Sequence, residues 1–313
     1  MSTPSIAIFG PTASGKTRLS LLLAEALGAE ILSADSRQVY RGLDIGTAKV
    51  SREERIKVRH HGIDICDPRQ PYSTGEYRRY ADKVIADIRT RGCVPLIVGG
   101  TGLYLSSLLT DFLCDEDDPR NLEVMNECRA RIAARRAAGD HEELYAELSS
   151  VDPESAAKYA DRNPRRVDRA LVYSLVNGIP FSTAHRTRTI AAHKDVIVFV
   201  IERERAELSD RIRRRVGEMW ESGLEDEVRT LVNDGVPRNA QSLATVGYRE
   251  MLEYLDGNVS MSDAQEATII ATRQYAKRQR TWARHQFTDA RRLTGSDEEM
   301  MRSVLKEFET HNH

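Results

Sequence analysis

The feature that most constrains the fold is a glycine-rich segment near the N-terminus, directly after an apolar run at residues 6–9. The segment consists of Gly10, Pro11, Thr12, Ala13, Ser14, Gly15, Lys16 and Thr17. This is the spacing of a phosphate-binding loop (P-loop), in which glycines turn the backbone so that successive N–H groups point at one anion. A helical pattern at 18–27 follows and stops before Gly28, so the helix N-terminus faces the phosphate. The sequence therefore predicts binding of a diphosphate or triphosphate, with Lys16 supplying positive charge and Thr17 holding Mg²⁺.

Further apolar runs predict strands at 29–34, 94–98 and 196–201. The last two do not end in the second Mg²⁺-holding Asp that nucleotide hydrolases of this class usually have. The run at 29–34 reaches Asp35, which we interpret as a candidate base at the catalytic edge of the sheet. The alternative is that Asp35 caps a helix or turn. Thr101 lies in the glycine-rich turn after 94–98. We expect it to orient either the substrate base or the Asp35 carboxylate. The alternative is that it is a simple turn residue.

Composition places the chain among globular proteins. It has 313 residues, of which 40% are hydrophobic and 30% charged, enough for a large core and two domains. No apolar stretch is long enough to cross a bilayer, and the N-terminus lacks a signal-peptide pattern. The four cysteines are scattered, without a Cys-x-x-Cys pair, which indicates reduced thiols and a cytoplasmic protein.

The order of the predicted elements indicates an α/β fold with a helical insertion. Strands alternate with helices in the first part of the chain, the rhythm of a parallel sheet flanked by helices. We expect a discontinuous P-loop core at 1–115 and 195–313, and a mostly helical insertion domain at 116–194. His60-His61 has no third ligand at metal spacing, so hydrogen bonding or packing is the better interpretation.

Basic residues are segregated although the net charge is only -2. No Asp or Glu occurs between Asp168 and Asp195, or in the window 267–288. The second window contains Arg273, Lys277, Arg280 and Arg284, which share one face of a helix. Such a stripe favours contact with a polyanion such as RNA. The alternative is a solvated helix face.

These segments together resemble one family, the tRNA dimethylallyltransferases. The matching segments, in order, are 10–17, 35–40, 44–49, 60–61, 64–65, 67–68, 72–73, 99–104, 246–250, 272–279 and 281–282. The resemblance implies transfer of a dimethylallyl group from dimethylallyl diphosphate to N6 of adenine 37 in tRNA, with Mg²⁺ as cofactor. It also implies that the helical insertion grips the anticodon stem-loop. No zinc-finger-like Cys/His cluster follows Trp282, which is typical of bacterial members.

The resemblance also implies a set of tRNA-contacting residues. They are Asp35, Ser36, Arg37, Gln38, Thr101, Arg129, Arg165, Arg166, Val167, Asp168 and Arg169. Arg165 stands where the family usually has Gln, so a phosphate contact is expected there in place of a base contact.

Physical reasoning assigns roles to these groups. The P-loop would hold the diphosphate as a leaving group, and Arg211 and Arg215, one helical turn apart, would clamp it or else contact RNA. Asp35 would accept the proton of a flipped-out adenine. We expect a monomer without an obligate protein partner or a membrane. Alternatives are a small-molecule P-loop kinase, an adenylate dimethylallyltransferase and a non-catalytic RNA-binding module.

Overall fold

The computed structural model describes residues 3–113, 119–187, 189–190 and 192–312, and the chain divides into two compact units. Unit 1 consists of Met1–Leu109 and His193–His313, and unit 2 of Thr110–Ala192. The boundaries between the two units, at 109/110 and 192/193, lie a few residues before the domain boundaries expected at 115/116 and 194/195. The physical reason is that the short strands β5 (Phe112–Leu113) and β6 (Thr189–Ile190) pair antiparallel with each other rather than joining the main sheet.

Unit 1 is built on a six-stranded parallel sheet, which confirms the predicted fold class. In spatial order its strands are β3 (His60–His61), β2 (Ala29–Ser33), β4 (Val94–Gly99), β1 (Ser5–Phe9), β7 (Val196–Ile201) and β8 (Arg291–Leu293). The central strands β1, β2 and β4 are buried along their whole length. Near-continuous apolar runs of this kind belong to strands that are covered on both faces.

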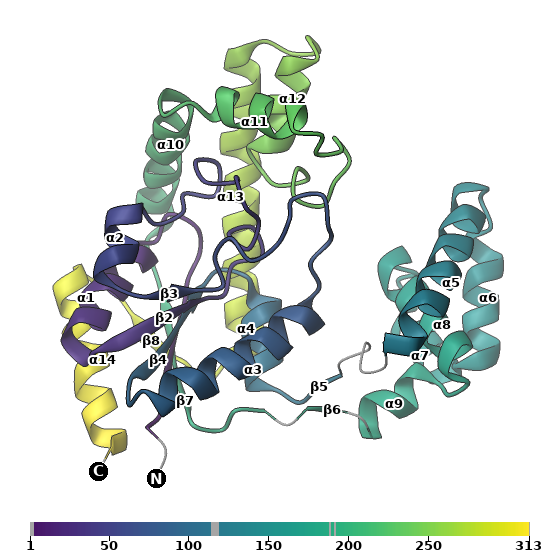
Figure 1. The fold of residues 1–313 in the computed structure, drawn as a ribbon, viewed down its shortest axis with the longest axis horizontal. Helices are drawn as coiled ribbons and strands as arrows, with labels where there is room; N and C mark the ends of the chain where they lie inside the picture. The colour runs from purple at the N-terminus through teal and green to yellow at the C-terminus, as the bar shows by residue number, and fades with distance from the viewer. Residues whose placement is uncertain (1–2, 114–118, 188, 191, 313) are drawn as a thin grey trace. The chain divides into compact units, whose positions relative to one another are not determined.

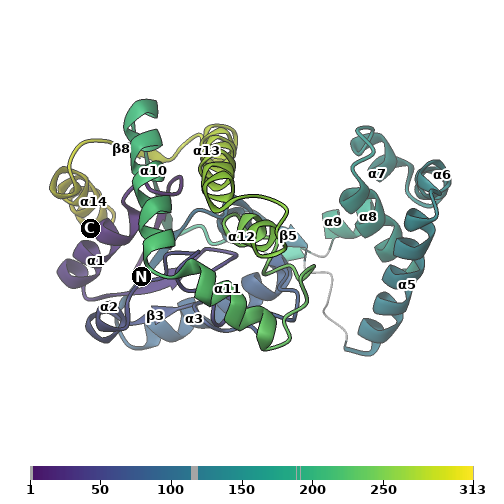
Figure 2. The same cartoon turned by 90° about the horizontal axis from the view of Figure 1, so that it is seen from above.

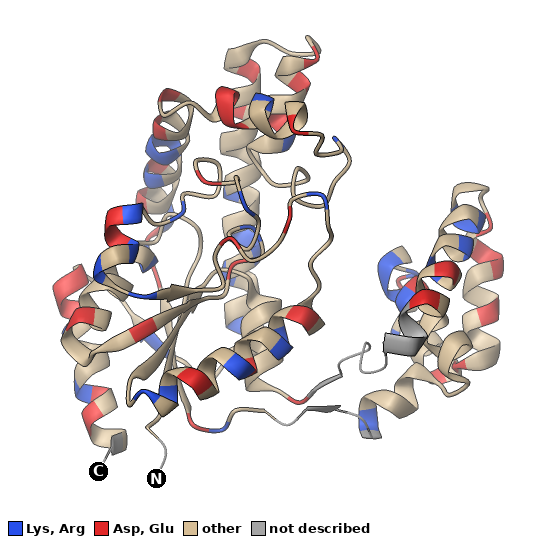
Figure 3. Ribbon diagram, in the orientation of Figure 1, with Lys and Arg blue, Asp and Glu red and all other residues tan. Residues whose placement is uncertain are grey.

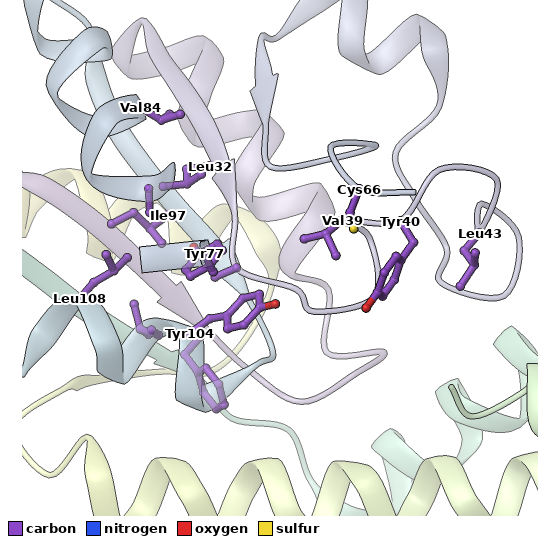
Figure 4. Close-up of a cluster of buried hydrophobic side chains, with 14 of the residues drawn as sticks. Leu32, Val39, Tyr40, Leu43, Cys66, Tyr77, Val84, Ile97, Tyr104 and Leu108 are labelled. Atoms are coloured by element: carbon purple, nitrogen blue, oxygen red, sulfur yellow. The ribbon is translucent and has the colours of Figure 1, made fainter. Parts of the chain in front are cut away.

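Helices cover both faces of this sheet (Figures 1 and 2). The helices of unit 1 are α1 (Lys16–Leu27), α2 (Arg52–Lys57), α3 (Thr74–Thr90), α4 (Gly102–Leu109), α10 (Arg205–Glu221), α11 (Leu224–Asn233), α12 (Tyr248–Leu255), α13 (Met261–Gln286) and α14 (Asp297–Asn312). One core cluster joins the sheet to α1 and α14. A second joins its other face to α3 and α4 and continues to α11 and α12; Figure 4 shows part of it, with the rings of Tyr77 and Tyr104 stacked.

Unit 2 is helical apart from its one strand pair. Its helices are α5 (Pro119–Ala137), α6 (His141–Val151), α7 (Pro153–Lys158), α8 (Pro164–Asn177) and α9 (Phe181–Thr187). Leu144, Leu148 and Leu171 are fully buried at its centre, so the unit has a hydrophobic core of its own. Helix α8 ends before Gly178, which adopts the left-handed conformation that glycine favours.

The structure also bears on the membrane spans and the cysteines that were considered from composition. Among the described residues, no helix is long and apolar enough to span a membrane. Cys66, Cys93 and Cys128 are free thiols, while Cys114 lies outside the described residues.

Candidate active site

The P-loop joins β1 to α1 as the sequence predicts. Gly15 caps the helix with φ 98°, in the left-handed region, and Lys16 is the first helical residue. The Lys16 Nζ atom donates hydrogen bonds to the carbonyl oxygens of Gly10 (2.9 Å) and Pro11 (2.8 Å). The ammonium group therefore lies across the loop, at the N-terminus of α1, where an anion is stabilised.

The loops that follow β2 and β4 lie beside the P-loop because the three strands are neighbours in the order β2-β4-β1. The N–H of Thr101 donates to the carbonyl oxygen of Ala34 at 3.1 Å. A Cβ on Gly99 would lie 2.0 Å from the same oxygen, so this approach requires glycine. Asp35 and Thr101 are thus held at the carboxyl edge of the sheet, with β4 between the strand of Asp35 and the P-loop.

Asp35 is both a turn residue and a pocket residue. Its Oδ1 atom accepts the N–H of Arg37 at 2.8 Å, and within the described residues this is the hydrogen bond that its carboxylate makes. Thr101 Oγ1 accepts the N–H of Ser36 at 2.9 Å. Thr101 therefore orients the Ser36 backbone, next to Asp35, rather than the Asp35 carboxylate itself.

A cavity of about 530 Å³ opens above these loops, within unit 1. Among its lining residues are Thr12, Asp35, Thr101, Arg215, Tyr275 and Trp282. Ser36 and Arg37 also line it, but Gln38 does not. Gln38 bonds instead to Ser33 Oγ, at 3.0 Å, behind the turn. Thr12 of the P-loop, the candidate base Asp35 and the rings of Tyr275 and Trp282 therefore line one cavity, which we call the acceptor pocket.

Lys16, on the P-loop, and Arg215, which lines the acceptor pocket, are close enough to act on each other electrostatically. Desolvation, and then the positive charge of Arg215, lower the pKa of Lys16 to about 7, against a smaller opposing effect of Asp35. Desolvation likewise lowers the pKa of Arg215, whose Nη2 atom donates to the Thr47 carbonyl oxygen at 3.3 Å. Within the described residues Arg215 has no carboxylate ion pair, and the charges of Asp35 and Glu218 only partly oppose the effect of desolvation on its pKa.

Arg211 lies one turn earlier on α10. A Cβ on Gly15 would lie 4.0 Å from its Nη1 atom, so the guanidinium is close to the P-loop. It is paired with Glu207 at 2.9 Å (Nε to Oε1) and does not line the acceptor pocket. The two arginines thus lie near the same loop, but Arg215 faces the pocket and Arg211 flanks it.

Helix α13 forms a wall of the acceptor pocket, and Gln279 fixes it in place. Gln279 Oε1 accepts the N–H of Thr12 at 2.9 Å, and its Nε2 donates to the Gly100 carbonyl at 2.8 Å. Next to it, a Cβ on Gly102 would lie 2.3 Å from the Trp282 ring. Sequence reasoning assigned no role to Gln279, whose side chain is buried, as are Ala276 and Ala283 on the same helix, and therefore needs hydrogen-bond partners.

The basic stripe of α13 lies away from this pocket. Tyr275, Arg278 and Trp282 line the acceptor pocket, as one shared helix face. Arg273, Lys277, Arg280 and Arg284 do not line it, because at 100° per residue they fall on the opposite side of the helix. Arg280 and Arg284 border a separate cavity of about 220 Å³. Figure 3 shows Lys and Arg residues in blue along α13. Contact between the stripe and RNA stays a prediction.

Two pocket cations escaped the sequence analysis. Arg249 and Arg278 both line the acceptor pocket. The Arg278 guanidinium lies 5.7 Å from the centre of the Tyr275 ring, and Arg249 pairs with Glu250. Arg37, which was expected, donates to the Gln241 carbonyl oxygen at 2.7 Å.

Unit 2 gathers several predicted RNA-contacting residues on its own. Arg129, Arg165, Asp168 and Arg169 line a cavity of about 300 Å³ between α5 and α8. Asp168 is tied to Arg136, with Nε to Oδ2 at 2.9 Å, so it braces the helices. Arg166 lies outside this cavity and pairs with Asp161 at 3.4 Å.

Val167, which the resemblance places among the tRNA-contacting residues, is buried, and RNA contact at this position stays a prediction. Val167 is 2% exposed because it packs in the core of unit 2, which leaves its side chain no surface to offer RNA.

The histidine pair is accounted for by hydrogen bonds, as predicted. His60 Nδ1 bonds to the Val58 carbonyl oxygen at 2.7 Å, and His61 Nε2 to Glu30 Oε2 at 2.6 Å. The hydrogen bond from Arg91, and then that from His61, lower the pKa of Glu30 to about 2 against the opposing effect of desolvation. In the part of the chain that the structure describes, no group of three His, Cys, Asp or Glu could hold a metal.

Comparison with protein families gives the decisive observation. The model of the family described as IPP transferase matches residues 38–286, and that described as isopentenyl transferase matches residues 5–64. The chain belongs to the IPP transferase family. The family resemblance read from the motifs is therefore confirmed.

Named relatives of this family are similar over nearly the whole chain. A tRNA dimethylallyltransferase of Geobacillus thermodenitrificans is 40% identical, over 97% of each chain. One of Bacillus subtilis is 42% identical, over 91% of this chain and 88% of its own. The crystal structure of a tRNA delta(2)-isopentenylpyrophosphate transferase from Staphylococcus epidermidis is 36% identical and superposes with a TM-score of 0.70, covering 98% and 99% of the two chains. The structure of a eukaryotic dimethylallyltransferase acting on tRNA superposes with a TM-score of 0.76 at 27% sequence identity. The match covers 89% of this chain and 69% of the eukaryotic one.

Proposed function

We propose that this protein transfers a dimethylallyl group from dimethylallyl diphosphate to N6 of adenine 37 in the anticodon loop of tRNA, releasing diphosphate. The curated relatives support the reaction class through their names. The observation that carries the assignment is a P-loop with the desolvated Lys16 ammonium bonded across it, next to a pocket that is lined by Arg215 and by the carboxylate Asp35. Such a site favours a ligand whose negative charge grows during the reaction.

The diphosphate is the leaving group. The exocyclic nitrogen of adenine forms a bond to C1 of the allylic chain while the C–O bond to the diphosphate breaks, so the electron pair goes to the bridging oxygen. The P-loop N–H groups, Lys16 and Arg215 stabilise that oxygen, and Arg211 adds charge from the flank. Binding the anion also restores the positive charge of Lys16, whose pKa is held at about 7 in the free protein.

Mg²⁺ fits the residues present as a cofactor shared with the diphosphate. Thr17 is exposed at the first turn of α1, beside Lys16, and its hydroxyl is the donor that a P-loop supplies. Mg²⁺ keeps several waters and binds through few protein groups plus substrate phosphates, so one hydroxyl suffices. When bound, the ion would neutralise charge on the departing diphosphate.

Asp35 accepts the proton that N6 loses. Its Oδ1 atom accepts the Arg37 N–H, and Asp35 lines the acceptor pocket, so Oδ2 is the oxygen we propose as the proton acceptor. An adenine stacked in a tRNA loop is out of reach of this carboxylate, so the base must be flipped out. Tyr275 and Trp282 supply aromatic surface for it within the cavity of about 530 Å³.

The tRNA is held in two places. Arg37, Arg249 and Arg278 surround the acceptor pocket and would contact the anticodon loop. Arg129, Arg165 and Arg169 on unit 2 would contact phosphates of the anticodon stem. We propose that the protein does this as a cytoplasmic monomer.

The direct test is incubation with dimethylallyl diphosphate, Mg²⁺ and unmodified tRNA, followed by mass analysis of the nucleosides. The expected result is one adenosine that gains a dimethylallyl group, and none in tRNA that carries guanine at position 37. Replacement of dimethylallyl diphosphate by ATP separates the kinase alternative, because a kinase would release ADP without any RNA.

A further inference from the structure

Residues 44–46 form a turn whose backbone N–H groups all point at one side chain. Glu227 of α11 accepts the N–H of Asp44 (2.9 Å) and of Ile45 (2.7 Å) with Oε2, and that of Gly46 (3.2 Å) with Oε1. The hydroxyl of Tyr248 donates to the same Oε1 atom. One carboxylate thus occupies a concave set of backbone donors, the kind of site that binds anions.

The turn is fitted closely around this contact. A Cβ on Gly46 would lie 2.3 Å from the Tyr248 ring, so only glycine fits there. On the other side of the turn, Lys49 bonds to Asp44 (2.7 Å) and Asp64 (2.6 Å). Glu227 therefore supplies the acceptor for donors that would otherwise lie unpaired against α11 and α12.

The same segment reaches the candidate active site one residue later. The Thr47 carbonyl oxygen accepts from Arg215 Nη2 at 3.3 Å and from Gln38 Nε2 at 3.4 Å. This carbonyl is the acceptor that the structure gives to the Arg215 guanidinium in the described part of the chain. Its position follows from the turn that Glu227 holds.

We propose that Glu227 is a positioning residue for diphosphate binding, acting through the turn at 44–46 and the Thr47 carbonyl on the orientation of Arg215. The inference rests on the proposed function, in which Arg215 binds the diphosphate. Glu227 itself lines a different cavity, with Asp44 and Ile45, and does not reach the acceptor pocket.

A double-mutant cycle tests this role with inorganic diphosphate and Mg²⁺ as the probe, titrated by calorimetry. Glu227→Gln keeps the shape of the side chain but removes its charge, and we expect it to weaken binding about tenfold, the size of coupling between neighbouring groups. In an Arg215→Gln background the same change should have no further effect. The control is Glu225→Gln, on the same helix, whose carboxylate pairs with Arg229; it should bind as the wild type does.

Hydrogen exchange supplies a readout of the turn itself. Glu227→Gln should speed exchange of the amides of residues 44–46 while those of β1 keep their protection. The positioning role is overturned if Glu227→Gln weakens diphosphate binding equally with Arg215 present and with Arg215→Gln. It is also overturned if Glu227→Gln does not weaken diphosphate binding at all. An unchanged affinity in Arg215→Gln alone overturns the diphosphate site of the proposed function, and the role of Glu227 with it.

Discussion

Gln279 Oε1 accepts the backbone N–H of Thr12 at 2.9 Å, which ties helix α13 to the P-loop across 267 residues of sequence. The Nε2 atom of the same side chain donates a hydrogen bond to the Gly100 carbonyl oxygen. One buried side chain thus fixes the spacing between the loop for the diphosphate, the turn that carries Thr101 and the aromatic wall of the acceptor pocket.

Gln279→Leu should destabilise the protein by roughly 2–4 kcal/mol, because it leaves a buried N–H and a buried carbonyl unpaired. Urea denaturation followed by circular dichroism measures this. Gln286→Leu, at the exposed end of the same helix, is the matched control and should change stability little. Equal stability of the two variants would show that the Gln279 bonds are dispensable.

Lys16→Met should stabilise the protein at neutral and acidic pH. The pKa of Lys16 falls from 10.5 to about 7 on folding, so between these values the unfolded chain binds a proton that the native state does not. Burial of Lys16 therefore lowers the free energy of unfolding by its full amount below pH 7. This destabilisation disappears as the pH rises toward 10.

The Tm of Lys16→Met should accordingly exceed that of the wild type by about 4 °C or more at pH 6.5, since 1 kcal/mol moves the Tm of a domain of about 150–250 residues, the size range of unit 1, by roughly 2–4 °C. The gain should shrink at pH 9.5. Lys158→Met, at an exposed position of unit 2, should show no such trend. A pH-independent gain would mean that the burial of Lys16 is not what costs stability.

Much of this site could be predicted from sequence because its signals are local. The P-loop, the strand ends at Asp35 and Thr101 and the insertion follow from short-range patterns. Gln279 could not be assigned because its partners lie far away in sequence. The basic spacing of α13 correctly placed four cations on one face, but spacing does not reveal which face meets the pocket. Val167 shows the same limit, since a motif position says nothing of burial.

Arg278→Ala should weaken tRNA binding more than Lys277→Ala does. The two residues are adjacent on α13, but Arg278 lines the acceptor pocket and Lys277 does not. Removing a cation that meets a phosphate should flatten the log–log salt dependence of affinity by about 0.7 to 0.9. Titrations at several salt concentrations measure the slope. An equal loss of tRNA affinity in both variants would mean that RNA also contacts the basic stripe of α13, to which Lys277 belongs.

Arg129→Ala and Arg165→Ala should each weaken tRNA binding severalfold and leave affinity for inorganic diphosphate unchanged. Both residues line the cavity of unit 2, whereas the P-loop belongs to unit 1. Arg186→Ala, which removes an exposed arginine paired with Glu154, is the control. Filter binding with an anticodon stem-loop would reveal the difference. Wild-type affinity in both variants would contradict an RNA-binding role of this surface.

The central claim is that the P-loop holds diphosphate as a leaving group while Asp35 takes the proton from adenine. Diphosphate release and dimethylallyladenosine formation should be measured in the same reaction, for the wild type, Asp35→Asn and Asp67→Asn. Asp67 is the matched control because its Oδ1 atom accepts the N–H of Arg69 at 2.8 Å, in the same kind of turn. The account predicts one diphosphate per modified adenosine in the wild type and in Asp67→Asn, and a kcat lower by about 10²–10⁴ in Asp35→Asn. Near-normal turnover by Asp35→Asn, or release of phosphate or ADP without modified tRNA, would contradict it.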